Sequence, residues 1–437
     1  MKTLDVFGIK KDQVESYVER DDVDGMFLEA LKTDRQIIVY GASKQGKTSL
    51  VDKHLPYKEN IVVSLTPKYT LLDIYQSVLS AMNVEMEGQV QSSSSSTSES
   101  SISARFKAMI PGVIGIDSGV ATKKNEGVNT TVNKECIEVN LSLPNDVARI
   151  IKKTKYRDKY IILENFHYLD EQIQKEFSFD LRSFLELGIN FVILGVWKEK
   201  NRLIQFNGDL LDRLIEVPVE PWEKDDFRRV IKIGEQKLNI HFSDEIKTKI
   251  INSAFDSIGV VQELLKVTCI NHGVTEGSSE LVQIDNIDAF NSASDEKAQD
   301  YSARHIRALE AIAEGRKTTN NPKSDDPKDM PLYLPYYTVK AFLKFDFQEV
   351  LEGIKRNVLE TRIKELHHRP DDVRAGDMSN LLHNFARLQS EKSISPPIFD
   401  YDKTTKTIRV IDSTFYFFLK NINCKEVEDS IYDPTKR

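Results

Sequence analysis

The sequence has 437 residues, which is too long for a single hydrophobic core and indicates two or three domains. Its content of 40% hydrophobic and 29% charged residues is that of a soluble globular protein. No segment approaches the roughly 20 apolar residues that a membrane-spanning helix needs, and the N-terminus lacks the features of a signal peptide. The net charge of -8 excludes a general attraction to nucleic acid, so such binding would need a local basic surface.

Three cysteines, Cys136, Cys269 and Cys424, lie far apart and form neither a disulfide framework nor a zinc-binding pattern. We interpret them as small buried side chains in a reducing compartment. The sequence therefore predicts a cytoplasmic protein without a membrane partner.

The first 30 or so residues have apolar side chains at helical spacing, among them Val14, Val18 and Leu31, and predict a lead-in helix. Five short apolar runs then have the length of buried parallel strands. They are Gln36–Tyr40, Asn60–Leu65, Tyr160–Leu163, Phe191–Gly195 and Leu214–Val217. Amphipathic helical patterns lie between most of them. Strands that alternate with helices predict a three-layer α/β domain with a five-stranded parallel sheet, here assigned to residues 1–221.

A segment at about residues 89–133 interrupts this alternation. It begins with a serine-rich run that is typical of a flexible linker. A short apolar piece with glycine and proline, Met109–Ile116, follows. This piece could be a loop that packs on a partner subunit, a pore loop, or a strand that covers an exposed sheet edge.

The rest of the chain predicts a helical lid, a linker and a winged helix. Residues 222–300 have helical patterns, one of them starting at Ser243, which is expected to be an N-cap. Residues 301–328 predict the linker, most clearly in the polar stretch from Gly315 to Lys328. In residues 329–437, three helical patterns precede a hairpin with arms at Pro397–Tyr401 and Thr407–Ile411, and this order predicts a winged-helix domain.

One motif carries a specific chemical prediction. The phosphate-binding pattern G-x-x-x-x-G-K-[ST] is matched by Gly41-Ala42-Ser43-Lys44-Gln45-Gly46-Lys47-Thr48, after an apolar strand and before a helix that includes Ser49. Its glycines let the backbone N–H groups point at phosphate oxygens, and the helix N-terminus adds its positive dipole end. We expect Lys47 to bridge the β- and γ-phosphates and the Thr48 hydroxyl to ligate Mg²⁺. The sequence therefore predicts that this loop binds ATP with Mg²⁺.

Such a loop needs an acid at the end of a buried strand, to position the metal ion and its water. Glu164 follows the run Tyr160–Leu163 and stands where the metal-associated acid belongs. Asn165 stands where a carboxylate would polarise the attacking water, and an amide cannot accept that proton. Hydrolysis should therefore be slow if this position is the base. Asn165 could belong to a natural ATP-gated switch or be a change made to trap nucleotide, or Glu164 itself could activate the water.

With these motifs, residues 14–270 resemble the AAA+ and STAND groups of P-loop ATPases, near their origin-recognition-like branch, and the winged helix extends the resemblance. The resemblance implies that the lead-in residues Tyr17, Val18 and Arg20 hold the adenine. It also implies an arginine finger that completes the site of a neighbouring subunit, and hence a homo-oligomer. Arg213 fits that role best and Arg202 less well, with a surface salt bridge as the alternative for Arg213. The lid keeps the family's glycine at Gly259 but lacks the arginine of the second sensor.

We expect an ATP-dependent regulatory switch, similar to bacterial regulatory or phage-defence ATPases. One alternative is a DNA-binding initiator or loader whose winged helix enters a major groove. A second is a structural partner that binds ATP and hardly hydrolyses it. A basic set in the winged helix could contact phosphates, but interleaved acidic residues predict a mixed-charge face as readily; the set is Arg362, Lys364, His367, His368, Arg369, Arg374, Arg387 and Lys392.

Overall fold

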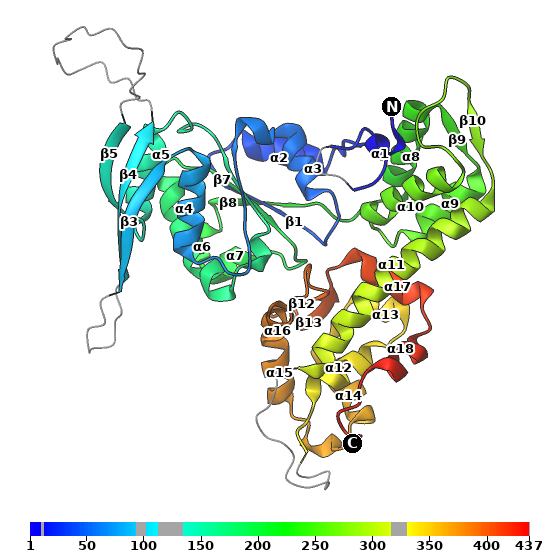
Figure 1. Ribbon diagram of the computed structural model, residues 1–437. Helices are drawn as coiled ribbons and strands as arrows, with labels where there is room; N and C mark the ends of the chain where they lie inside the picture. The colour runs from blue at the N-terminus through cyan, green and yellow to red at the C-terminus, as the bar shows by residue number, and fades with distance from the viewer. Residues whose placement is uncertain (10–12, 93–101, 112–133, 316–329, 437) are drawn as a thin grey trace, which may run out of the picture.

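The computed structural model describes residues 1–9, 13–92, 102–111, 134–315 and 330–436. Its centre is a five-stranded parallel sheet in the order β2-β6-β7-β1-β8 (Figure 1). The strands are β1 (Gln36–Tyr40), β2 (Ile61–Ser64), β6 (Ile161–Glu164), β7 (Phe191–Gly195) and β8 (Leu214–Pro218). The predicted α/β class and all five predicted strands are confirmed, and this strand order is typical of a P-loop core.

Two separate apolar clusters cover the two faces of this sheet, because successive side chains of a strand point to opposite faces. Ile37 and Val39 of β1 pack with the helices α2 and α3, whereas Ile38 and Tyr40 pack with the helices α4 to α7. The result is the predicted three-layer arrangement. These helices are α2 (Val23–Leu31), α3 (Lys47–His54), α4 (Leu71–Ala81), α5 (Pro144–Lys153), α6 (Glu171–Glu186) and α7 (Arg202–Phe206).

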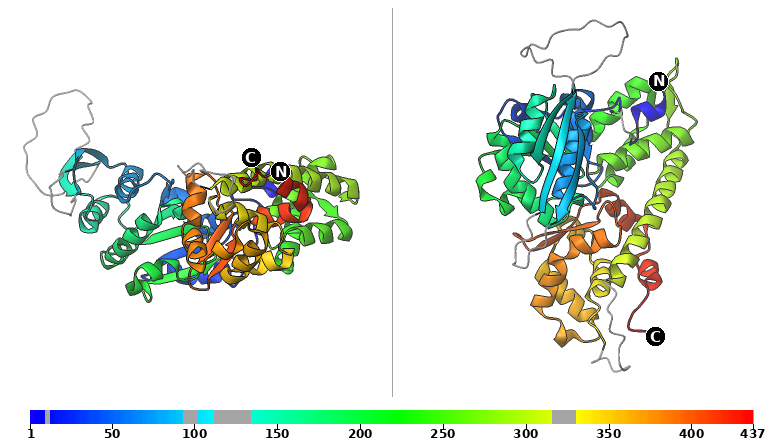
Figure 2. Two further views of the ribbon diagram at one scale, coloured as in Figure 1. Left: turned by 90° about the horizontal axis from the view of Figure 1, so that it is seen from below. Right: turned by 60° about the vertical axis from the view of Figure 1, so that its left-hand side comes forward.

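Part of the predicted flexible insert is a regular antiparallel sheet, made of β3 (Glu85–Ser92), β4 (Ile102–Pro111) and β5 (Lys134–Asn140). Phe106, Ala108 and Ile110 alternate along β4 and are buried in the cluster that includes α4 and α5. The start of the apolar piece is thus a strand that packs on the core, at the end of the molecule far from the C-terminal helices (Figures 1 and 2). The serine-rich residues 93–101 and residues 112–133 lie outside the described residues.

The predicted lead-in helix is confirmed only in its second half, from Val23 to Leu31, and is wrong for the residues before it. The structure has two helices there, α1 (Thr3–Val6) and α2, and residues 13–20 form neither helix nor strand. Val6 and Phe7 pack into the core of the lid, Tyr17 and Val18 line a cavity, and Met26 and Leu28 are exposed. Helical spacing alone gave the wrong structure here because these apolar side chains lie in three different environments: the lid core, the cavity lining and the solvent-exposed surface.

The lid follows the core sheet and contains one long helix that the sequence divided. Its elements are α8 (Lys224–Leu238), β9 (Ile240–Phe242), α9 (Asp244–Ser253), α10 (Ile258–Asn271), β10 (Val282–Ile284) and α11 (Ile287–Glu314). The Ser243 side chain accepts from the Ile246 N–H, as an N-cap should. Helix α11 crosses the predicted boundary at residue 300, because Tyr301, His305 and Leu309 continue its buried face. Most of the predicted linker Gly315–Lys328 lies outside the described residues.

The C-terminal unit has the helices and hairpin expected of a winged helix, with β11-β13-β12 as its sheet. It shares one continuous apolar cluster with the lid, to which α11 contributes. Its elements are α12 (Leu334–Phe342), α13 (Phe347–Glu352), β11 (Ile354–Lys355), α14 (Arg356–Leu366), α15 (Ala375–His383), α16 (Phe385–Glu391), β12 (Phe399–Asp402), β13 (Thr407–Val410), α17 (Ser413–Asn421) and α18 (Cys424–Ser430).

Two further sequence-based expectations can be compared with the structure. Of the cysteines, only Cys269 is buried; Cys136 is exposed and Cys424 is partly exposed, so the prediction of burial is wrong for these two. Among the described residues, no helix is both long and apolar enough to cross a membrane.

Candidate nucleotide-binding site

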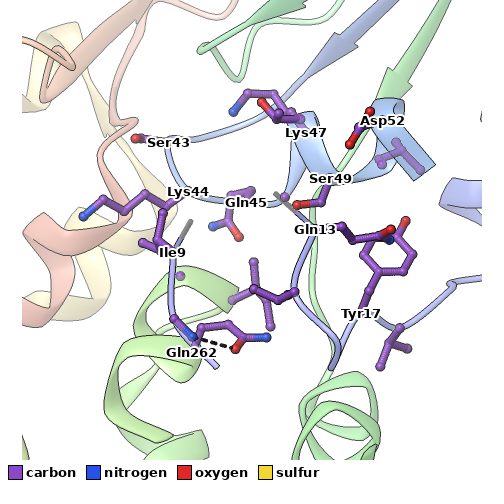
Figure 3. Close-up of a pocket in the computed structure, with 18 of the residues that line it drawn as sticks. Ile9, Gln13, Tyr17, Ser43, Lys44, Gln45, Lys47, Ser49, Asp52 and Gln262 are labelled. Atoms are coloured by element: carbon purple, nitrogen blue, oxygen red, sulfur yellow. Dashed lines mark hydrogen bonds between the residues drawn. The ribbon is translucent and has the colours of Figure 1, made fainter. Parts of the chain in front are cut away.

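A cavity of about 750 Å³ lies beside the loop that joins β1 to α3 (Figure 3). Its lining brings together the loop residues 43–49, the lead-in residues Tyr17, Val18 and Arg20, and the acid-bearing pair Glu164 and Asn165. Gly41 and Ala42 belong to the same loop but are not part of the lining. Cavities of several hundred Å³ are typical of sites for small molecules and cofactors. The structure therefore gathers the predicted phosphate, adenine and metal positions around one space.

The loop turns sharply into α3 at Gly46. Its φ of 85° lies in the left-handed region that side chains other than glycine rarely adopt. The first N–H groups of α3 have no partner within the helix, and they lie at the positive end of the helix dipole. Backbone N–H groups in this arrangement bind phosphate oxygens.

Lys47 is folded back onto its own loop. Its Nζ donates to the carbonyl oxygens of Gly41 at 3.0 Å and Ala42 at 2.6 Å. Burial lowers the pKa of Lys47 to about 8, and the negative charge of Glu220 opposes this only in part. A phosphate in the cavity would give the ammonium group a charged partner, and it would favour the protonated form.

Glu164 ends β6 beside the loop, within reach of the Thr48 hydroxyl, which donates to its Oε1 at 3.3 Å. Tyr57 and Ser64 also donate to this carboxylate. Asn165 follows in the left-handed conformation, with φ 60° and ψ 31°. A hydroxyl and a carboxylate are ligand types that Mg²⁺ accepts, and Mg²⁺ usually binds through one or two carboxylates together with substrate phosphates. Thr48 and Glu164 fit an ion that arrives with a nucleotide and neutralises its phosphate charge.

No group of three or more His, Cys, Asp or Glu side chains among the described residues could hold a metal ion by itself.

The lead-in segment is fixed by Asp24. Its carboxylate accepts from the Tyr17 hydroxyl at 2.6 Å and from the Arg20 backbone N–H at 2.8 Å. The buried Arg20 guanidinium lies 3.9 Å from the centre of the Trp222 ring and donates to the Val219 carbonyl at 2.9 Å. Arg20 thus braces the wall of the cavity. Contact of these residues with adenine stays a prediction.

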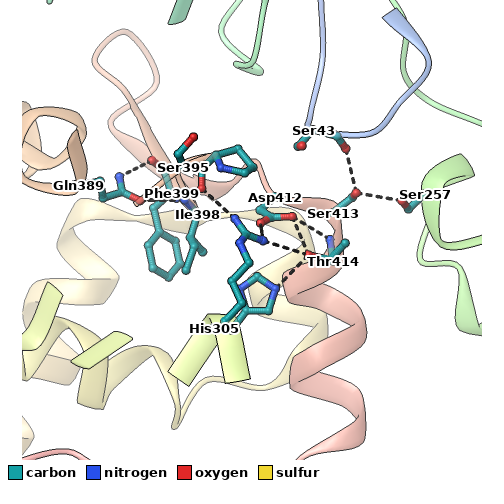
Figure 4. Close-up of polar contacts among 12 residues, drawn as sticks. Ser43, Ser257, His305, Gln389, Ser395, Ile398, Phe399, Asp412, Ser413 and Thr414 are labelled. Atoms are coloured by element: carbon teal, nitrogen blue, oxygen red, sulfur yellow. Dashed lines mark hydrogen bonds and ion pairs between the residues drawn. The ribbon is translucent and has the colours of Figure 1, made fainter. Parts of the chain in front are cut away.

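The lid and the C-terminal unit both hold the loop (Figure 4). Ser43 donates its backbone N–H to the Ile411 carbonyl at 2.8 Å and accepts the Ser413 hydroxyl at its own carbonyl at 2.9 Å. The Ser257 hydroxyl of the lid donates to Ser413 Oγ at 2.9 Å. The Gly259 N–H donates to the Lys44 carbonyl at 3.1 Å. A change in the shape of the loop must therefore act on both units.

The C-terminal part of this contact is anchored by Asp412, whose side chain is fully buried. Its carboxylate pairs with Arg304 of α11 and accepts from the Thr414 backbone N–H at 3.1 Å. His305 of α11 also contacts the Thr414 hydroxyl, at 2.9 Å. These polar contacts, drawn in Figure 4, tie the start of α17 to the lid.

Sequence reasoning missed several residues at this site. Glu220 accepts from the Ala42 N–H at 2.5 Å and from the Gln45 side chain at 3.2 Å, and so holds the loop from the end of β8. Neither Glu220 nor Ser413 belongs to a motif, and no pattern in the sequence points to them.

The two finger candidates lie apart from the cavity. Arg213 precedes β8, at the edge of the sheet opposite the phosphate-binding loop. Its Nη1 donates to the Asp209 carbonyl at 2.8 Å, and it makes no ion pair with another described residue. Arg202 lies 5.3 Å from the centre of the Trp197 ring and pairs with Asp400 of the C-terminal unit at 3.4 Å. Arg202 is therefore engaged within the chain.

No protein-family model and no curated protein matches the sequence. Many solved structures resemble the fold at low sequence identity, among them the following three. A Walker-type ATPase of Pyrococcus abyssi has 12% identity and a TM-score of 0.43, and the match covers 94% of this chain and 98% of that one. The Aeropyrum pernix Orc1 protein in complex with DNA has 9% identity and a TM-score of 0.41, with 93% of this chain and 94% of that one covered. A RuvB variant of Thermotoga maritima has 10% identity and a TM-score of 0.40, with 94% of this chain and 98% of that one covered. Likenesses this distant assign neither an activity nor a partner to this chain.

Proposed function

We propose that this chain is a cytoplasmic ATPase that binds ATP with Mg²⁺ and acts as a nucleotide-dependent switch. The observation that carries the proposal is the placement of Thr48 and Glu164 at the loop that borders the 750 Å³ cavity, with Thr48 Oγ1 3.3 Å from Glu164 Oε1. A phosphate-binding loop, a hydroxyl and a strand-end carboxylate are the parts that triphosphate chemistry needs. With an amide at Asn165, the turnover is proposed to be slow.

The switch part of the proposal is supported by the contacts of the loop. Ser43 and Lys44 contact the C-terminal unit and the lid through their backbone atoms. A ligand that draws the loop N–H groups inward changes both contacts. The nucleotide site and these contacts are then coupled, and such coupling acts in both directions. ATP should therefore change the position of the C-terminal unit.

Substitution of Lys47 tests the central claim. Lys47→Ala in the full chain should weaken ATP binding at least tenfold, about 1.4 kcal/mol, because the cation that faces the phosphates is lost. Lys58→Ala, on an exposed residue outside the cavity, is the matched control and should bind ATP as the wild type does. Calorimetric titration with ATP measures both. A folded Lys47→Ala protein with wild-type affinity would overturn the proposal.

A bacterial regulatory or phage-defence role is the setting that we propose for such a switch. In a homo-oligomer, Arg213 of one subunit would complete the site of the next. Survival of cells under phage challenge, with the wild type or Lys47→Ala expressed at equal level, tests this role. Equal survival would rule out a role in phage defence and leave the proposal of ATP binding unaffected.

A DNA-binding loader has less support. The hairpin β12–β13 packs against the core, where Lys403 pairs with Glu171 at 2.5 Å and Asp400 with Arg202. Several members of the basic set have acidic partners, such as Arg369 with Asp372 and Lys392 with Glu314, both at 2.6 Å. The mixed-charge interpretation is therefore favoured. Salt-dependent binding of duplex DNA in the presence of ATP would reverse this preference.

A further inference from the structure

Three hydroxyl groups surround the Glu164 carboxylate on the wall of the cavity. One belongs to Thr48, and the other two, from Tyr57 and Ser64, have no role in the sequence motifs. Tyr57 Oη donates to Oε1 at 2.8 Å, and Ser64 Oγ donates to Oε2 at 2.9 Å. A carboxylate offers about four lone-pair positions, so these contacts fix its orientation and still leave a position for a metal ion or its water.

Tyr57 is held in place by the helix that follows the phosphate-binding loop. It begins the short helix η1 (Tyr57–Glu59) just after α3, and its backbone N–H donates to Asp52 Oδ1 at 2.8 Å. Its ring packs against the apolar cluster of α2 and α3. One rigid element thus supports both Thr48 and Tyr57.

The orientation of Glu164 matters because few other acids are available. Among the described residues that line the cavity, only Glu164 and Asp52 carry a carboxylate. Asp52 accepts from the Tyr57 backbone, and Asn165 has no negative charge. A cation beside Thr48 therefore depends on Glu164 for its charged protein contact.

We propose that Tyr57 is a positioning residue for the metal-associated acid, with Ser64 as a weaker counterpart. The Tyr57 hydroxyl holds the Glu164 carboxylate toward the Thr48 hydroxyl, so that Mg²⁺ brought by ATP meets a prepared pair of oxygens. Ser64 contributes less because its contact is exposed to solvent, where water can replace it, whereas the Tyr57 contact is partly buried. This inference rests on the proposed ATP and Mg²⁺ function.

The test measures ATP affinity of the full chain in EDTA and then over a range of Mg²⁺ concentrations. Loss of a group that orients a metal-binding carboxylate costs roughly 10–100-fold in metal affinity. In each protein, the quantity to compare is the Mg²⁺ concentration at which half of the Mg²⁺-dependent increase in ATP affinity is reached. We expect Tyr57→Phe to raise this concentration by at least about tenfold, and Ser64→Ala to raise it by less. ATP affinity in EDTA should stay within about threefold of wild type, because the Tyr57 hydroxyl donates to Glu164 and is proposed to act through that acid.

Tyr160→Phe is the matched control, since it removes a partly buried hydroxyl that donates to the Leu31 carbonyl at 3.2 Å, outside the cavity lining. It should leave the Mg²⁺ requirement unchanged. An unchanged requirement in a folded Tyr57→Phe protein, or an equal rise in Tyr160→Phe, would overturn the positioning role. If Tyr57→Phe does not fold, Ser64→Ala tests the shared premise that hydroxyl groups orient Glu164: a smaller rise in the Mg²⁺ requirement supports it, and no rise overturns it. Failure of the wild type to bind ATP both in EDTA and with Mg²⁺ would instead refute the proposed function itself.

Discussion

Gly259 is the point at which the lid touches the phosphate-binding loop, and its replacement by alanine tests that contact. A Cβ at this position would lie 2.6 Å from Lys44 Cβ and 2.9 Å from the Lys44 carbonyl oxygen. Carbon atoms pack best at roughly 3.5–4.0 Å, so the lid and the loop must separate by about 1 Å. The separation would also stretch the 3.1 Å hydrogen bond between Gly259 N–H and Lys44.

We expect Gly259→Ala to lower the free energy of unfolding by about 1–3 kcal/mol, the range for overpacked sites. In domains of roughly 150–250 residues, each 1 kcal/mol lowers Tm by roughly 2–4 °C. Because Lys44 moves with the loop, the Kd for ATP should also rise about tenfold, equivalent to about 1.4 kcal/mol. Calorimetric melting and titration with ATP, performed on the same preparation, measure the two effects.

Gly25→Ala is the control for this experiment. Gly25 lies inside α2, and a Cβ there would have no atom within 4 Å. This change should stabilise the protein by roughly 0.5–1 kcal/mol, because glycine is a poor helix former, and it should not affect ATP binding. If Gly259→Ala melts and binds ATP as the wild type does, the contact between lid and loop does not govern the site.

Four further changes follow from the same geometry. Asn165→Asp should raise ATP turnover by on the order of 10²-fold, measured as phosphate release, and equal rates would place the base elsewhere. Arg213→Ala should bind ATP normally but lose both turnover and ATP-dependent assembly, because a finger arginine contributes roughly 10³–10⁵ in rate. Light scattering measures the assembly, and a fully active variant would show that Arg213 is only a surface residue. Asp412→Asn leaves Arg304 without its buried acid and should lower the free energy of unfolding by about 3 kcal/mol in urea denaturation. Because the pKa of Lys47 falls from 10.5 to about 8 on folding, the unfolded chain binds more protons at this residue between those values, and its contribution to stability should rise with pH across that window. Stability measured from pH 8 to pH 10.5 should therefore rise less steeply in Lys47→Met than in the wild type, and parallel curves would contradict this.

The sequence by itself determined the core sheet and the phosphate-binding loop. The strands could be predicted because each is a short apolar run bounded by turns, a pattern contained within a few residues. The loop could be predicted because the need for glycine at Gly46, with φ 85°, and for a cation and a hydroxyl at Lys47 and Thr48 is met within eight consecutive positions. The position of Glu164 beside the loop could also be predicted, because the carboxyl ends of parallel strands lie at one edge of the sheet.

Only the tertiary structure decided what surrounds the loop. Ser413 reaches Ser43 across 370 positions of the chain, and Tyr57 reaches Glu164 across 107. Each contact is a single hydrogen bond between distant segments, and such a bond leaves no periodicity or spacing in the sequence. Burial against other elements also decided the path of the lead-in segment and the continuation of α11 past the predicted domain boundary. Such burial sets which apolar residues share a face. Local chemistry thus specified the motif, and packing between distant segments specified which residues hold it.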